Sequence, residues 1–210
     1  MNLRSTTFLF TFLLLVFSPI RGWTGEIGEL IVLEDFSEIG ENGLPIGWKA
    51  NRENPEPTEI YEFKKKGDLS FLHANGRPNR IFKKIKWNPN EYPFISWKWR
   101  MIKVPNNPQK EKNATLYVSL GKDIIGIPKI TKYAWSSIKA VGSEISGGFF
   151  RPTVIILESG AAKEGEWITE TINVLKDHER LHNETPPDEA YGIGIMTTLE
   201  AEFAYIIAHK

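Results

Sequence analysis

The segment His178-Glu-Arg-Leu-His182 has the spacing of a zinc-protease motif. On a helix, residues four apart share a face, so both imidazoles could bind zinc while the glutamate acts as a general base. A third ligand would have to come from elsewhere in the chain, and Glu200 and Glu202 are the candidates. The flanking residues are polar and Pro186 follows soon after, which is typical of a short solvated turn. A zinc-dependent hydrolase that uses these residues is the alternative hypothesis. The leading hypothesis, developed below, is a protein that needs no cofactor.

Acidic side chains offer two further kinds of chemistry. Glu158 and Glu170 lie in or beside predicted strands, and a glycosidase needs two carboxylates that face each other across a cleft. Glu34 and Asp35 follow an apolar strand and could join a structural calcium site, because calcium prefers carboxylate and carbonyl oxygens. A plain surface location is the simpler interpretation of Glu34 and Asp35, and the sequence alone does not place Glu158 and Glu170 across a cleft.

The polar side of a long strand is the best candidate for a binding face. Residues two apart in a strand share a face, so Tyr92–Val104 places its tryptophans on one side and its polar residues on the other. A mid-strand arginine needs an acidic partner, an exposed face or a ligand. A second strand, Ala114–Leu120, offers a similar polar face if the two strands are neighbours. The predicted ligand-binding residues are Ser96, Lys98, Arg100, Thr115 and Tyr117.

Seven tryptophans are the other prominent signal. An indole presents a flat apolar face and a polar N–H, which suits both sugar stacking and a packed core. The chain has no cysteine, so disulfides cannot stabilise it, and a core rich in aromatic residues is expected to do so instead. The residues assigned to that core are Trp48, Trp97, Trp99, Trp135 and Trp167.

Charge and the first residues restrict the functional class. Lysine plus arginine equals aspartate plus glutamate at 26 each, and this balance argues against a nucleic-acid-binding protein. A short basic start precedes the apolar run Thr7–Phe17, which is the layout of a secretory signal peptide. We expect cleavage after residues 1–22, a single domain over 26–210, no stable membrane insertion after cleavage, and a location in the periplasm or outside the cell. An uncleaved anchor is the alternative.

The rest of the chain consists of short strands separated by glycine- and proline-containing turns, with no internal repeat. This pattern predicts an all-β antiparallel sandwich, jelly-roll-like in topology and similar to galactose-binding or concanavalin-like folds, with few helical turns. The predicted strands are Leu30–Phe36, Ile60–Phe63, Ser70–Ala74, Ile81–Trp87, Tyr92–Val104, Ala114–Leu120, Lys132–Ser136, Thr153–Leu157, Trp167–Val174, Tyr191–Thr198 and Phe203–Ala208, and Leu175–Asn183 is predicted to be helical.

Several segments together resemble the DUF3047 family, bacterial exported domains of unknown function. The resemblance covers most of the chain after the leader and rests on the order and spacing of Gly43-Leu-Pro-Ile-Gly-Trp48, Trp97-Lys-Trp-Arg100, Tyr133-Ala-Trp135, Glu158-Ser-Gly160, Trp167-Ile-Thr-Glu170 and Gly192-Ile-Gly-Ile-Met-Thr197. It implies an exported β-sandwich, similar in its opening to carbohydrate-binding jelly-rolls, with no established activity. The sequence departs from the family pattern at several positions where the family has charged residues. This chain has the uncharged Thr115, Ile172 and Thr198 at three of them. The leading hypothesis is therefore a non-catalytic module that binds carbohydrate or another cell-envelope component.

Overall fold

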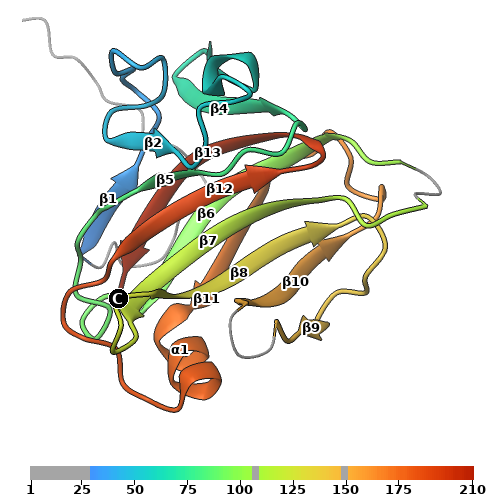
Figure 1. The fold of residues 1–210 in the computed structure, drawn as a ribbon. Helices are drawn as coiled ribbons and strands as arrows, with labels where there is room; N and C mark the ends of the chain where they lie inside the picture. The colour runs from blue at the N-terminus through green and yellow to red at the C-terminus, as the bar shows by residue number, and fades with distance from the viewer. Residues whose placement is uncertain (1–28, 106–108, 148–150) are drawn as a thin grey trace, which may run out of the picture.

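The computed structural model describes residues 29–105, 109–147 and 151–210, so the predicted signal peptide lies outside the described residues. The described chain is mostly β-structure, with one α-helix and one short 3-10 helix (Figure 1). The elements are β1 Leu30–Glu34, β2 Trp48–Ala50, η1 Pro57–Glu59, β3 Tyr61–Lys66, β4 Leu69–Asn75, β5 Ile81–Lys83, β6 Phe94–Lys103, β7 Asn113–Lys122, β8 Pro128–Ser136, β9 Glu144–Ile145, β10 Thr153–Ser159, β11 Ile168–Asn173, α1 Val174–His182, β12 Gly192–Thr197 and β13 Glu200–His209.

The strands form two sheets that face each other. The front sheet has the order β2-β5-β12-β7-β8-β10-β9, and the back sheet has the order β11-β6-β13-β4-β3 with β1 added beside β13. All pairs are antiparallel except β8 and β10, which run parallel. The predicted all-β, jelly-roll-like sandwich is confirmed, and α1 lies at one end of it (Figure 1).

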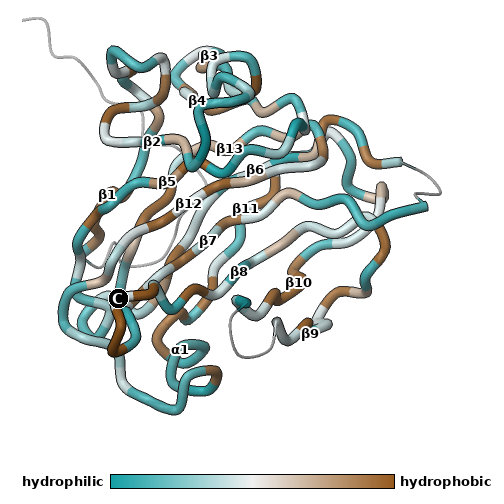
Figure 2. Tube along the Cα trace, viewed as in Figure 1, coloured by the Kyte–Doolittle hydropathy of each residue, from teal (hydrophilic) through white to brown (hydrophobic). Residues whose placement is uncertain are grey.

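The core between the sheets is aromatic. Trp97 and Trp99 project inward from β6, and Trp99 meets Trp135 from the front sheet at 5.9 Å between ring centroids. Phe203 of β13 contacts the Trp99 ring, with 6.0 Å between the ring centroids. Trp48, Trp97, Trp99 and Trp135 are all buried. Hydrophobic residues concentrate along the strands, whereas much of the surrounding loops is hydrophilic (Figure 2).

Trp167 departs from the expectation that it belongs to this core. It is half-buried and lies on the outer surface of the back sheet, where its ring contacts Phe71 at 5.6 Å and the guanidinium of Arg100 at 4.8 Å. Alternation explains the difference: Ile168 and Ile172 of β11 pack against the core, so residues of odd number in this segment point away from it.

Two segments are longer or shorter than their sequences predict. The lysines 64–66 belong to β3 rather than to a turn, because Gly67, with φ of 60°, and Asp68 close a two-residue hairpin. The strand predicted over Ile81–Trp87 ends at Lys83. The helix agrees with its prediction: Asn173 caps it by accepting from the Lys176 amide at 2.9 Å, and Asn183 ends it in the left-handed conformation.

Candidate functional site

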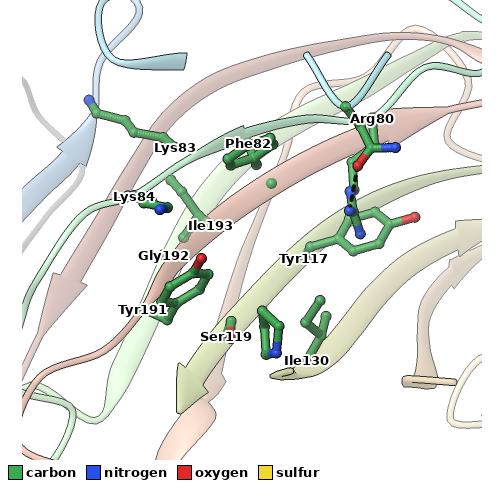
Figure 3. A pocket seen from close by; sticks show the side chains of 13 residues that line it. Arg80, Phe82, Lys83, Lys84, Tyr117, Ser119, Ile130, Tyr191, Gly192 and Ile193 are labelled. Carbon is green, nitrogen blue, oxygen red and sulfur yellow. Dashed lines mark hydrogen bonds between the residues drawn. The ribbon is translucent and has the colours of Figure 1, made fainter. Parts of the chain in front are cut away.

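The outer face of the front sheet carries a groove. On β7 the apolar side chains of Leu116 and Val118 enter the core, so the alternate residues Tyr117 and Ser119 face outward. Three adjoining pockets, of about 170, 350 and 680 Å³, share lining residues and form one continuous depression, which we call the basic groove. Its principal lining residues are Asn51, Arg80, Phe82, Lys84, Tyr117, Ser119, Lys122, Ile130, Lys132, Tyr191, Gly192 and Gly194. Figure 3 shows the central part of the groove, with Arg80, Tyr117 and Tyr191 around it.

Two glycines of β12 form part of the groove floor. A Cβ atom on Gly194 would lie 3.0 Å from the Ile81 carbonyl oxygen and 3.4 Å from the Tyr117 Cβ. Gly192 has φ of 151°, and a Cβ there would lie 2.3 Å from the Lys83 carbonyl oxygen. Because neither position can hold a side chain without displacing its neighbours, the depression beside Tyr117 stays open.

Cationic side chains lie over both tyrosine rings of the groove. At one end the Arg80 guanidinium and the Lys132 ammonium lie 5.6 and 5.1 Å from the centre of the Tyr117 ring. At the other end the Lys84 and Lys122 ammonium groups lie 5.5 and 4.3 Å from the centre of the Tyr191 ring. The negative face of each ring attracts the cations, so the tyrosines hold positive charge inside the groove.

Burial and like charge act together at the Tyr117 end. Burial lowers the pKa of the Lys132 ammonium, and the nearby Arg80 and Arg151 guanidinium groups lower that pKa further. Burial also raises the pKa of the Tyr117 hydroxyl, against the opposing effect of Arg80. Both shifts indicate a partly desolvated pocket, and the shift of Lys132 also reflects the positive charge of its neighbours.

The model of one protein family, described as a protein of unknown function (DUF3047), matches residues 47–201. The chain belongs to the DUF3047 family. The resemblance predicted from the sequence is thus confirmed, and all of the groove-lining residues fall inside the matched range. No functionally curated protein matches the chain in sequence.

Solved structures with a similar arrangement of strands include carbohydrate-binding modules. One is the family 11 module of the cellulosomal cellulase Lic26A-Cel5E of Clostridium thermocellum, with 12% identity and a TM-score of 0.44 over 87% of this chain and 95% of that one. A family 11 module from the same organism, in complex with a β-1,3-1,4-mixed-linked tetrasaccharide, has 11% identity and a TM-score of 0.45 over 86% and 95%. A module specific for non-crystalline cellulose, CBM28, has 14% identity and a TM-score of 0.43 over 86% and 91%.

The structure does not bring the five sequence-predicted binding residues of this DUF3047 chain together. Strands β6 and β7 lie in different sheets. Trp97 and Trp99 of β6 point into the core, so the alternate residues Ser96, Lys98 and Arg100 lie on the outer face of the back sheet. Tyr117 lines the basic groove on the opposite side of the sandwich. Thr115 faces the same way as Tyr117 but lies beyond the groove, where its hydroxyl donates to Asn113 Oδ1 at 3.2 Å.

The back-sheet residues are engaged with other protein groups. Arg100 forms an ion pair with the buried carboxylate of Glu202 and also lies over the Trp167 ring. Ser96 is 1% exposed and hydrogen-bonds with Thr171 and His209 at 2.7 and 2.9 Å. The mid-strand arginine therefore has an acidic partner within the sheet, and ligand binding on the β6 face stays a prediction.

Most of the groove residues escaped the sequence prediction. Arg80, Lys84 and Lys122 lie at or just beyond strand ends, where isolated charges usually indicate solvated turns. One signal was available, because Gly192 and Gly194 alternate along a strand and predict room for a large neighbour. The structure shows that the neighbour of Gly194 is Tyr117.

The proposed zinc ligands lie on α1, away from the suggested third ligands. The helix begins beside Pro93 at one end of β6, whereas Glu202 pairs with Arg100, about 20 Å further along that strand. Within the described ranges, no three His, Asp or Glu side chains come together in a way that could hold a metal ion.

No helix among the described residues is long and apolar enough to span a bilayer.

The other acidic candidates have local protein partners. Glu158 forms an ion pair with Lys163 at 2.5 Å, and Glu170 accepts from the Trp99 indole N–H at 3.2 Å. Neither glutamate lines the basic groove. Glu34 is buried and accepts from Lys83 Nζ at 2.8 Å, so an ammonium group already lies where its carboxylate could have held a metal ion.

The two histidines of α1 predict a pH-dependent stability. Their rings lie 4.6 Å apart, and burial lowers the pKa of both, assisted for each by the positive charge of Lys129 and opposed by Glu184. Below about pH 6.5 the unfolded chain therefore binds more protons at these histidines than the folded protein does. The free energy of unfolding should fall as the pH drops through that value.

Denaturant titrations at about pH 7.5 and about pH 5 check this expectation. Carboxylates also titrate in this window, so the comparison is with a variant carrying both His178→Gln and His182→Gln. The loss of stability on acidification should be smaller in the double variant than in the wild type. An equal loss in both proteins would contradict a role for the histidines.

Proposed function

We propose that this chain is an exported, non-catalytic module that binds a glycan chain in the basic groove. The observation that carries the proposal is the groove itself, an open depression on one face of a β-sandwich, lined by aromatic rings and by side chains that donate hydrogen bonds. Apolar ring faces pack against the C–H faces of sugars, while amide, hydroxyl and cationic groups bind their oxygens. The proposed export rests on the signal-peptide layout of residues 1–22.

The length of the groove favours a chain over a single sugar. Gly192 pairs with Ser119, so Tyr191 lies about three residues along β7 from Tyr117, or about 10 Å. The pockets at either end extend the depression beyond both rings. A ligand that contacts both tyrosine clusters must therefore be longer than one pyranose ring.

Binding to a glycan panel, followed by calorimetry with Tyr191→Ala, tests the proposal. We expect at least one polysaccharide to bind the full chain, and we expect Tyr191→Ala to weaken that binding about tenfold, or about 1.4 kcal/mol. Tyr191 is half-buried, so circular dichroism should show an intact fold. Lys98→Ala provides the comparison on the back sheet. Loss of binding in Lys98→Ala with none in Tyr191→Ala would place the site on the back sheet, and failure of every glycan to bind would refute the function.

A further inference from the structure

The cations of the basic groove lack acidic partners. Arg80, Lys84, Lys122 and Lys132 form no ion pair with any carboxylate in the described ranges. Other cations nearby do find one: Lys83 pairs with Glu34 at 2.8 Å and Lys86 with Glu189 at 2.7 Å. Glu189 is the one acidic residue among the described residues that line the groove, and Lys86 already neutralises it.

The guanidinium of Arg80 also has unused hydrogen-bonding capacity. Its Nη2 donates to Asn51 Oδ1 at 2.9 Å, while its buried Nε has no hydrogen-bond partner. Buried donors are nearly always satisfied, so this Nε is an unusual feature of the groove wall. The fork of a guanidinium matches a planar carboxylate in particular.

The proposed function does not say whether the glycan is charged, and the unpaired cations bear on that point. We propose that the ligand of the groove is an acidic polysaccharide whose carboxylates bind the Arg80–Lys132 pair at one end and the Lys84–Lys122 pair at the other. This inference rests on the proposed glycan-binding function and specifies its substrate class. The lowered pKa of Lys132 is consistent with it, because an anion would relieve the repulsion from Arg80 and Arg151.

The two cation pairs favour a charged polymer over an isolated acid. They lie about 10 Å apart along β7, so carboxylates repeated along one chain can contact both at once. A nucleic acid also carries repeated negative charge and stacking rings. The protein as a whole has no basic surplus, with 26 basic and 26 acidic residues, which favours a glycan over a nucleic acid.

Matched polymers provide the test. Polygalacturonate and alginate are each compared with their fully esterified, uncharged forms by calorimetry with the full chain at low and at high salt. We expect at least one acidic polymer to bind at least ten times more tightly than its ester. That difference should shrink at high salt because screening weakens the ion pairs. Single-stranded DNA is included as a polyanion without carboxylates.

Variants then distinguish a binding role from a structural one. Lys132→Met and Lys84→Met should each weaken binding of the acidic polymer several-fold and weaken binding of the ester much less, because only the acidic polymer loses an ion pair. Lys132 is half-buried without an acidic partner, so its replacement should leave the temperature of unfolding unchanged or raised. Lys103→Met, which removes an exposed charge from the back sheet, is the matched control and should not alter binding.

The possible failures are separable. Equal binding of acid and ester, lost in Tyr191→Ala, would refute the acidic ligand and leave glycan binding intact. No binding of any saccharide would refute both proposals. Tighter binding of DNA than of every polysaccharide would replace the acidic glycan with a phosphodiester. An effect of Lys103→Met equal to that of Lys84→Met would show that general charge, and not the groove, governs binding.

Discussion

Replacing Trp99 with alanine is expected to lower the free energy of unfolding by about 3–5 kcal/mol. The side chain is fully buried and joins both sheets, since its ring contacts Trp97 and Phe203 of the back sheet and Trp135 of the front sheet. Alanine would leave a cavity between rings that cannot collapse without moving one sheet, and it would deprive Glu170 of the indole N–H. Denaturant unfolding monitored by circular dichroism measures the loss.

Trp167→Ala is the matched control for this prediction. The same residue type is removed, but from the outer surface of the back sheet, where Trp167 contacts Phe71 and Arg100. Because Trp167 is partly exposed and makes a surface cation–π contact, its removal is expected to lower the free energy of unfolding by about 1 kcal/mol. Equal losses in the two variants would show that the sandwich does not depend on the interior tryptophan cluster.

A loss of similar size, about 3–5 kcal/mol, is expected for Glu34→Ala. One carboxylate oxygen accepts from the Phe36 amide at 2.7 Å, and the other accepts from the Trp48 indole at 2.5 Å and from Lys83 Nζ at 2.8 Å. Phe36 is buried and has φ of 54°, so its amide needs this acceptor in an unusual backbone conformation. Alanine would leave two buried donors and one partly buried ammonium group without the carboxylate that accepts from them.

A double-mutant cycle separates the charge from the other donors. Lys83→Met alone removes the ammonium group, and in the pair Glu34→Ala with Lys83→Met no cation is left stranded. We expect the double variant to be more stable than the sum of the single losses implies, with a coupling of about 1–3 kcal/mol. Asp35→Ala, on the exposed neighbour that binds Ser37, should cost much less. Strict additivity between Glu34 and Lys83 would contradict the ion pair's role.

The class of fold followed from the sequence because alternation reports which side of a strand is buried. It identified the inward row of β6, including Trp97 and Trp99. Alternation does not report which sheet a strand joins. Strand β6 belongs to the back sheet and β7 to the front sheet, which separates Arg100 from Tyr117. The groove was unpredictable for the same reason, since Arg80, Tyr117, Lys132 and Tyr191 meet only through long-range pairing.

The ends of the two sheets bear on how the protein behaves at high concentration. A sheet edge offers unpaired backbone groups that a second molecule can extend, which is a common beginning of aggregation. Here β2 and β9, at the ends of the front sheet, have three and two residues, too few to template a long pairing. On β3, at one end of the back sheet, Lys64, Lys65 and Lys66 would oppose the approach of an identical edge. Three of the four sheet ends are therefore poor templates for a second molecule, which leaves the six-residue β11, at the fourth end, as the edge most open to such pairing.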